Sequence, residues 1–403
     1  MSVESNIGTK SDRLPAEFRL VAACCHWPPS PRRDALVGAA GSGEIDWNLV
    51  LQIADRQRVN SLVADGLVRS RLSVPSAVTD VLSSRTAAVS RLSLLQAAES
   101  VRLQEMFDAD GIPTVILKGS ALAVLAYGNL GMKHSWDIDL LVAKRDAAAA
   151  RRILQVIGYV GEAPPDSFDD ERFREWTQIA HESGLRNPTS GLHVELHWRL
   201  CSNAALLAEV SPQTDFQSVA IGGNWTLRTL GDESLYAYLC LHGARHGWSR
   251  LKWLADLAAW IGQKPPEEIE RLHRVALARH VGRASGQALL LSNALFGTSL
   301  PTGLAAEIRA DRLTRWLVAI SLDSMAGTVR QIEDRRLGTL VIASSHLLLA
   351  TGWTQFVQEL RAKSVGWNEF QDIRLPRFLY VLYPFLRFPA WLWRHGRRLM
   401  QQR

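Results

Sequence analysis

The chain has 403 residues, of which 47% are hydrophobic and 21% are charged, and its formal net charge is +6. This length and composition favour a globular protein of two or three domains and exclude a chain that is disordered throughout. After Asp372 the chain contains seven arginines and no acidic residue. The positive charge is therefore concentrated near the C-terminus, where it suits a solvated basic tail or a polyanionic partner.

The cysteines and the hydropathy pattern indicate the cellular compartment in which the protein is expected. Cys24, Cys25, Cys201 and Cys240 show neither the spacing of a structural zinc site nor that of a disulfide framework. No stretch of about 18 apolar residues occurs, and the apolar segment 18–27 starts too late and is too short for a secretory signal. We therefore expect a soluble protein in the reducing cytoplasm.

The first part of the chain, residues 1–98, is predicted to be a helical region. Apolar residues recur at helical spacing in three segments, 47–54, 62–67 and 87–107. Such amphipathic helices bury one face, so we expect this region to pack against the domain that follows.

Residues 99–230 are predicted to form an α/β core. Asp110-Gly111 ends the preceding helix, and the next segment is apolar on both faces, as in a buried strand. Ser120 is expected to cap the helix that follows. The predicted strands are 113–117, 136–142, 176–182 and 192–200, and the predicted helices are 121–127 and 146–157.

Residues 231–370 are predicted to be a helical domain, and residues 371–403 a basic aromatic tail. The expected helices are 235–246, 251–261, 284–295 and 315–322. In the tail, Pro384 and Pro389 exclude one long straight helix. Two interpretations of the tail remain open: peripheral membrane contact through residues 374–403, or packing of its aromatic residues on the helical domain.

Asp137-Ile138-Asp139 is the most informative tripeptide for function. On a strand, residues i and i+2 face the same side, so the carboxylates of Asp137 and Asp139 are expected to converge. Two like charges beside a buried strand are costly unless a cation neutralises them, and carboxylate oxygens suit Mg²⁺ bound together with nucleotide phosphates. A pair of solvent-facing aspartates at a strand end would give the same tripeptide.

Lys118-Gly119-Ser120 lies between a predicted strand and a predicted helix. Glycine lets backbone N–H groups approach an anion, and a helix N-terminus carries partial positive charge. The two motifs occur here in a fixed order: a strand, the Gly-Ser turn, a helix, and then a strand with Asp-x-Asp. This arrangement is much more specific for a phosphate-binding and metal-binding site than either motif alone. No Walker-type phosphate loop occurs in the chain.

Glu195 is the candidate for a third carboxylate. In segment 193–198, alternation places His193, Glu195 and His197 on one strand face. Glu195 then either helps to hold a metal or accepts the proton of an acceptor hydroxyl. A different chemistry also fits this face, since His193, Glu195 and His197 form a donor set suited to a zinc hydrolase.

A basic cluster follows in the helical half. The spacing of His242 and His246 puts them on one helix face, with Arg250 close behind. We expect these three residues to contact triphosphate or acceptor from across the cleft, with Asp256 orienting a neighbouring side chain.

Together these motifs resemble the polymerase β-type nucleotidyltransferase superfamily, and most closely its uncharacterised bacterial branch of stand-alone nucleotidyltransferases. The resemblance covers residues 100–260 and is carried by 117–122, Tyr127, 131–133, 137–142, 158–159 and 194–198. The chain departs from the family pattern at Lys133, where arginine is usual, and at Trp136, where the family has a small residue.

The resemblance implies an α+β fold: a small mixed sheet flanked by helices, with a helical N-terminal region and a helical C-terminal domain. It implies catalytic and metal-binding roles for Asp137, Asp139 and Glu195, with Mg²⁺ or Mn²⁺ as cofactor. The implied nucleotide-binding residues are Lys118, Gly119, Ser120, Lys133, His242, His246 and Arg250.

The implied reaction moves a nucleoside monophosphate from a nucleoside triphosphate, with ATP expected, to an unidentified acceptor, and releases pyrophosphate. Transfer from a nucleotide-activated sugar and a non-catalytic nucleotide-binding or interaction protein of the same fold are the alternatives. A nucleic acid partner is not expected, because the chain lacks the interleaved basic and aromatic motifs of RNA-binding modules.

Overall fold

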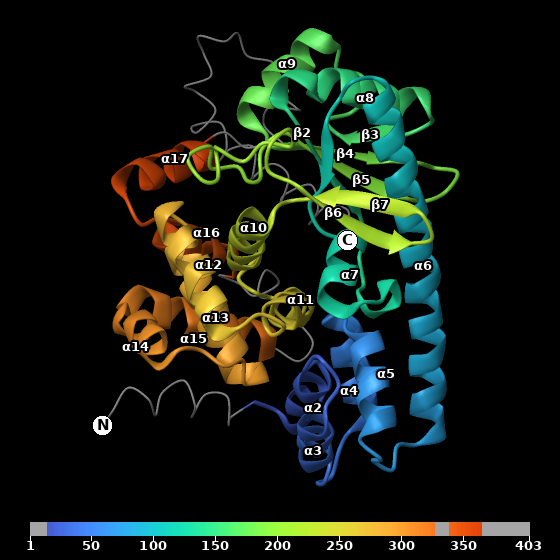
Figure 1. Cartoon of the computed structure of the whole chain (residues 1–403), viewed down its shortest axis with the longest axis vertical. Helices are drawn as coiled ribbons and strands as arrows, with labels where there is room; N and C mark the ends of the chain where they lie inside the picture. The colour runs from blue at the N-terminus through green and yellow to red at the C-terminus, as the bar shows by residue number, and fades with distance from the viewer. Residues whose placement is uncertain (1–13, 327–337, 365–403) are drawn as a thin grey trace, which may run out of the picture.

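The computed structural model describes residues 14–326 and 338–364, which form one mixed sheet surrounded by helices (Figure 1). The basic aromatic tail expected at 371–403 lies outside the described residues. The strands are β1 (Thr114–Ile116), β2 (Ile138–Val142), β3 (Val160–Ala163), β4 (Glu182–Arg186), β5 (His193–His197), β6 (Gln217–Gly222) and β7 (Trp225–Thr229).

Helices precede the sheet, interrupt it and follow it along the chain. Before and within the sheet they are α2 (Ala16–Cys24), α3 (Pro31–Ala40), α4 (Trp47–Arg56), α5 (Asn60–Arg69), α6 (Ser76–Ala109), α7 (Ser120–Tyr127), α8 (Ala147–Val156) and α9 (Asp170–Ile179), with short 3-10 turns η1 (Leu130–Met132) and η2 (Lys144–Asp146). After the sheet they are α10 (Asp232–Arg245), α11 (Leu251–Ile261), α12 (Pro266–Ala278), α13 (Gly282–Phe296), α14 (Thr302–Ala310), α15 (Arg312–Ala326), α16 (Gly338–Leu349) and α17 (Trp353–Ser364).

The sheet has seven strands in the order β3-β4-β5-β2-β1-β7-β6. β2 pairs in parallel with β5, and β1 pairs in parallel with β7, whereas the remaining neighbours are antiparallel. This mixed sheet flanked by helices confirms the predicted α+β fold. Its central strands β1, β2 and β5 are the three strands that carry or adjoin the candidate site.

The N-terminal helices form as their sequence predicts. Asp46 caps α4 by accepting hydrogen bonds from the backbone N–H groups of residues 48 and 49 at 2.9 and 3.1 Å. α4 then buries Val50, Ile53 and Ala54, which share one helix face. The 34-residue α6 is much longer than the predicted segment 87–107, and it runs from the N-terminal helices to the sheet (Figure 1).

The strand predicted at 176–182 is wrong, because residues 170–179 form helix α9. Asp169 caps this helix by accepting a hydrogen bond from the backbone N–H of Arg172 at 2.8 Å. Phe173, Trp176 and Thr177 are spaced for one helix face and are buried. The cap and the spacing outweigh the short alternation that favoured a strand.

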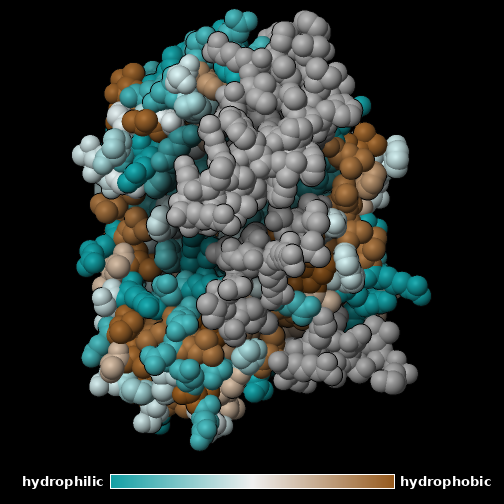
Figure 2. Space-filling view, turned by 180° about the vertical axis from the view of Figure 1, so that it is seen from behind, coloured by the Kyte–Doolittle hydropathy of each residue, from teal (hydrophilic) through white to brown (hydrophobic). Residues whose placement is uncertain are grey.

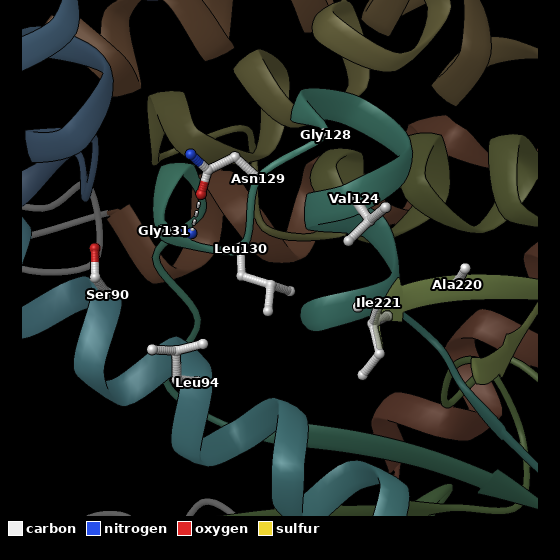
Figure 3. A pocket seen from close by; sticks show the side chains of 10 residues that line it. Ser90, Leu94, Val124, Gly128, Asn129, Leu130, Gly131, Ala220 and Ile221 are labelled. Carbon is white, nitrogen blue, oxygen red and sulfur yellow. Dashed lines mark hydrogen bonds between the residues drawn. The ribbon is translucent and has the colours of Figure 1, made fainter. Parts of the chain in front are cut away.

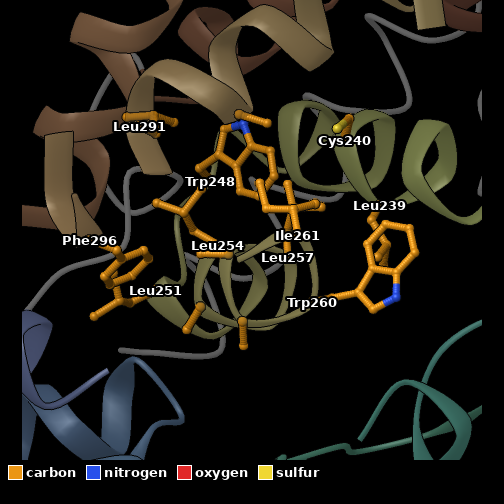
Figure 4. Close-up of a cluster of buried hydrophobic side chains, with 14 of the residues drawn as sticks. Leu239, Cys240, Trp248, Leu251, Leu254, Leu257, Trp260, Ile261, Leu291 and Phe296 are labelled. Atoms are coloured by element: carbon orange, nitrogen blue, oxygen red, sulfur yellow. The ribbon is translucent and has the colours of Figure 1, made fainter. Parts of the chain in front are cut away.

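Two apolar clusters fill the interior. One lies between α6, the sheet, α8 and α9. The other is larger and joins the N-terminal helices, α7 and the helices after the sheet, with α11 at its centre. Figure 4 shows Trp248, Leu254 and Ile261 packed together in this larger cluster. The N-terminal helices and the helical half therefore share one core.

Apolar and polar residues are interspersed over the described part of the rear face (Figure 2). None of the helices within the described ranges is long and apolar enough to cross a membrane. All four cysteines are buried and free.

Candidate active site

Two neighbouring parallel strands carry the buried carboxylates. β2 and β5 pair so that Asp139 lies opposite Glu195 and Leu141 lies opposite His197. Because alternate residues of a strand face the same side, Asp139, Glu195 and His197 share one face of the sheet. One ligand atom from each of these three side chains lies within 4.8 Å of the others.

Asp139 is only 1% exposed, and nearby cations stabilise the charge of its carboxylate. The Lys118 ammonium lies 3.0 Å from Asp139 Oδ1, and His197 Nε2 lies 3.4 Å from the same oxygen. Burial alone would raise the pKa of Asp139, but Lys118 and His197 outweigh it and hold the pKa well below its ordinary value. Lys118 and His197 therefore favour the charged carboxylate form of Asp139.

Glu195 behaves differently from its neighbour. Burial raises its pKa, and the charges of Asp139 and Asp137 raise it further, against the opposing contact with His197. The resulting pKa is about 7. A carboxyl group with a pKa near neutrality can exchange a proton at physiological pH, as a general base must.

His197 bridges two acidic groups. Its Nε2 faces Asp139 and lies 3.6 Å from Glu195, whereas its Nδ1 lies 3.3 Å from Glu182 at the start of β4. Burial would lower the pKa of His197, but these three carboxylates raise it to about 10. A second group of potential ligand atoms consists of His181, Glu182 and His197.

Asp137 lies directly before β2 and is half-buried. Its carboxylate forms no ion pair with the described residues, and it is outside the group formed by Asp139, Glu195 and His197. Its charge still acts on this site, because it raises the pKa of both Glu195 and Lys118. The structure thus places Asp137 beside the cluster and available to a ligand.

The histidine set predicted for a zinc hydrolase is not assembled. His193 Nδ1 lies 3.6 Å from Glu162, and its ring is 6.3 Å from that of Trp136. Among the described residues, the ligand group that contains Glu195 includes Asp139 and His197 but not His193. The zinc-hydrolase alternative is therefore wrong about its donor set.

The turn between β1 and α7 is formed as predicted, but its cap differs. Gly119 is the N-cap residue, and Ser120 is the first helical residue, with no side-chain cap bond. Gly119 has φ +65° and ψ −127°, a backbone conformation that residues other than glycine rarely adopt. Gly119 and Ser120 are both buried, and the helix N-terminus that they form carries the partial positive charge that favours an anion.

Asp256 on α11 binds two residues of the sheet half. Lys133 Nζ lies 2.5 Å from one oxygen of Asp256, and the Tyr127 hydroxyl donates to the other oxygen at 2.9 Å. All three groups are buried. Asp256 therefore orients both side chains and neutralises the charge of Lys133.

Arg250 faces the N-terminal helices. Its guanidinium donates to the backbone carbonyl of Arg56 at 2.7 Å. It does not line the cavity described next.

A cavity of about 290 Å³ opens beside Asp139 and Glu195. His242 of α10 and His246, directly after that helix, also line it, with their ring centroids 4.7 Å apart. Burial, and then the charge of Lys118, lowers the pKa of His242 well below its ordinary value, so this imidazole is neutral. The histidine pair thus lines the same cavity as Asp139 and Glu195, and its contact with triphosphate or acceptor stays a prediction.

A second hollow, of about 450 Å³, lies between α6, the end of α7 and β6 (Figure 3). Leu94, Val124 and Ile221 point into it, and Asn129 accepts a hydrogen bond from the N–H of Gly131 at 2.9 Å (Figure 3). None of the described residues that line this hollow is acidic or basic. It therefore offers no group for acid, base or metal chemistry.

Sequence reasoning did not place His181, Glu182 and His197 in the nucleotidyltransferase site. The alternation of segment 193–198 already put His197 on the face of Glu195, so that signal was present. His181 and Glu182 lay at the end of a segment wrongly predicted as a strand, and no local pattern marked them.

The comparisons with known proteins agree with this geometry. Residues 43–297 match the model of a family described as an uncharacterised nucleotidyltransferase. The match covers more than half of the chain and includes the turn, the carboxylates and the histidine pair, and the family that it identifies is one of transferases of phosphorus-containing groups. The chain belongs to this uncharacterised nucleotidyltransferase family. A comparison with curated proteins finds no match.

The residues present fit a divalent cation, which nucleotidyltransferases generally use. Asp139 and Glu195 offer carboxylate oxygens side by side, and the nitrogen of His197 would join them on losing its proton. Neither oxygen of Asp139 accepts a hydrogen bond of good geometry from the described residues. Buried oxygens of this kind are stabilised by a metal ion.

Proposed function

We propose that the protein transfers a nucleoside monophosphate from a nucleoside triphosphate, with ATP as the expected donor, to a hydroxyl or similar group of a small molecule, saccharide or peptide. The pairing of Asp139 with Glu195 in register, beside a cavity, carries this proposal. Two adjacent buried carboxylates are costly by themselves and favourable when a cation binds between them and a polyphosphate. We expect the enzyme in the cytoplasm, where nucleoside triphosphates are available.

Asp137, Asp139 and Glu195 would hold Mg²⁺ or Mn²⁺ in this proposal. When bound, the metal neutralises charge on the reacting phosphate and leaving group.

The chain's own residues bind the reactants and move one proton. The amides of Gly119 and Ser120, with Lys118 beside them, bind phosphate oxygens. Glu195 accepts the proton of the acceptor hydroxyl as its oxygen bonds to the α-phosphorus. The bond from the α-phosphorus to the bridging oxygen breaks, and pyrophosphate leaves with the electron pair.

The remaining predicted residues take two roles. His242 and His246 contact the acceptor in the cavity, where neutral imidazoles donate or accept hydrogen bonds. Lys133 and Arg250 hold the surrounding elements in place, since Asp256 and the Arg56 carbonyl bind them.

Calorimetry with each nucleoside triphosphate, with and without Mg²⁺ or Mn²⁺, tests this proposal. We expect metal-dependent binding by the wild-type protein and its loss in the Asp137→Asn/Asp139→Asn double variant. Glu267→Gln is the matched control, because Glu267 is exposed on α12 and lies outside the cavity.

The same titrations separate the alternatives. Preference for a nucleotide sugar over every nucleoside triphosphate would indicate transfer of a sugar. Binding that survives without metal and in the double variant would favour a non-catalytic protein of this fold. Failure to bind any nucleotide would refute the proposal.

A further inference from the structure

The segment 133–137, just before β2, is a meeting point of three parts of the chain. The His134 carbonyl accepts a hydrogen bond from Lys252 of α11 at 3.2 Å. The Ser135 hydroxyl lies 3.9 Å from the position that a Cβ at Gly119 would take. The Trp136 ring has the Arg58 guanidinium over it, 5.6 Å from the centroid. This segment therefore brings Lys252, the phosphate turn and Arg58 together next to Asp137.

Lys252 is a buried amine without an acidic partner in the described part of the chain. It is 8% exposed, and its ammonium forms no ion pair with a carboxylate among residues 14–326 and 338–364. Burial, and then the charges of Lys133 and Arg58, lowers its pKa well below the ordinary value. An ammonium in such surroundings costs free energy unless an anion binds beside it.

Arg58 is supplied by the turn between α4 and α5. Its backbone has φ +56°, in the left-handed region, which is uncommon for a residue other than glycine. The side chain is half-buried and forms no ion pair with a carboxylate in the described part of the chain. The N-terminal helices therefore contribute a free positive charge beside Trp136.

The other two lysines of this region are already neutralised. Lys118 is paired with Asp139 at 3.0 Å, and Lys133 is paired with Asp256 at 2.5 Å. Lys252 and Arg58 are thus the basic side chains of this region that no carboxylate among the described residues neutralises, and a bound anion would favour the charged form of Lys252. Neither lines the cavity of the histidine pair.

We propose that Lys252 and Arg58 form the binding site for the β- and γ-phosphates of the donor, beside the segment that leads to Asp137. This inference rests on the proposed function and adds a polyphosphate site built jointly by the N-terminal helices and α11. The terminal phosphates are the part of the donor with the highest charge density, which two free cations match. The departing pyrophosphate would be held by the same two residues.

Titration of ATP, AMP and inorganic tripolyphosphate by calorimetry tests this site on the full chain with Mn²⁺ present. Lys252→Met should lower the affinity for ATP and for tripolyphosphate by about 10- to 100-fold and leave the affinity for AMP unchanged. Arg58→Gln should act in the same direction with a smaller loss, since Arg58 is more exposed. Lys144→Met is the matched control, because Lys144 is exposed at the opposite end of β2.

Thermal unfolding of the free protein provides a second readout. Lys252→Met removes a buried polar group that has no acidic partner among the described residues, so its Tm should equal or exceed that of the wild type. A lower Tm with unchanged tripolyphosphate affinity would give Lys252 a structural role and overturn the site while leaving the proposed function intact. A wild-type protein that binds AMP and ATP equally and no tripolyphosphate would overturn the site as well. Absence of all nucleotide binding would overturn both.

Discussion

The two walls of the cavity are held in place by different forces. On the sheet wall, the positions of Asp139 and Glu195 follow from the backbone register of β2 and β5. On the helical wall, His242 is positioned by side-chain packing, since the neighbouring Gly243 lies against the ring of Trp248. A one-residue slip of a strand would reverse every side chain, whereas a helix can shift slightly. The sheet wall is therefore suited to precise chemistry and the helical wall to adjustment around an acceptor.

The largest expected effect is on the sheet wall. Glu195→Gln removes the proposed proton acceptor, so the rate of nucleotidyl transfer should fall by about 10²- to 10⁴-fold. ATP affinity should fall less, because Asp137 and Asp139 remain. Single-turnover transfer to an identified acceptor measures the rate, and calorimetry measures the affinity. A variant with wild-type rate would remove Glu195 from the mechanism.

Glu359, a buried carboxylate outside the segment matched by the family, holds Arg245 of the helical wall in an ion pair. Glu359 of α17 is 1% exposed, and Arg245 of the cavity lies 2.9 Å from it. Glu359→Gln leaves Arg245 without its ion pair, and should lower the free energy of unfolding at pH 7 by about 3 kcal/mol. Urea unfolding measures this. The exposed Glu267→Gln control should change stability by less than about 0.5 kcal/mol.

The effect of Glu359→Gln should depend on pH. Burial raises the pKa of Glu359, but His346 and Arg245 outweigh burial and lower it well below its ordinary value. Its contribution is complete above the unfolded-state pKa of about 4.3 and is lost as the pH falls through the lower folded-state pKa. The difference between wild type and variant should therefore be constant above about pH 6 and shrink below about pH 4. A difference that grows on acidification would contradict this assignment.

Gly243→Ala tests the packing of the helical wall directly. An added Cβ would lie within van der Waals overlap of the Trp248 ring, which belongs to the apolar cluster around α11 (Figure 4). We expect a loss of about 1 to 3 kcal/mol in the free energy of unfolding, together with weaker acceptor binding as His242 moves. Metal-dependent ATP affinity should persist, since the sheet wall is unchanged. Equal losses of both affinities would show that the walls are not independent.

Gly38→Ala should give the smallest change in the free energy of unfolding, and it is the matched comparison for Gly243→Ala. Gly38 also lies within a helix, α3, but nothing is within 4 Å of the position of its Cβ. Alanine should raise the free energy of unfolding by about 0.5 to 1 kcal/mol by reducing the freedom of the unfolded chain. Destabilisation measured in urea would instead point to a contact that this position makes elsewhere.

Local patterns predicted the elements that hold the phosphate turn. The buried strand, the glycine turn and the helix predicted at 113–127 correspond closely to β1, Gly119 and α7. The strand at 192–200 contains β5, and its alternation correctly placed Glu195 and His197 on one face. Periodicity was sufficient in these segments because each buries a continuous apolar face. The adjacency of Asp139 and Glu195 was implied by the family resemblance and not by any local pattern.

Other features depend on tertiary contacts that no local pattern encodes. Lys252 occupies the second position of an amphipathic helix, where a lysine is usually solvated. Its burial follows from the nearby His134 carbonyl and the turn that carries Arg58. The hairpin of β6 and β7 did have a local signal, Gly222-Gly223, which was overlooked.

The apolar core shared by the N-terminal helices and the helical half has a practical consequence for handling the protein. The family match begins at residue 43, yet Phe18, Leu20 and Val21 of α2 are completely or almost completely buried in the same cluster as α11. A chain shortened to the matched segment would expose this surface to water and self-associate. Recombinant production and crystallisation should therefore keep α2 and α3 attached to the catalytic part.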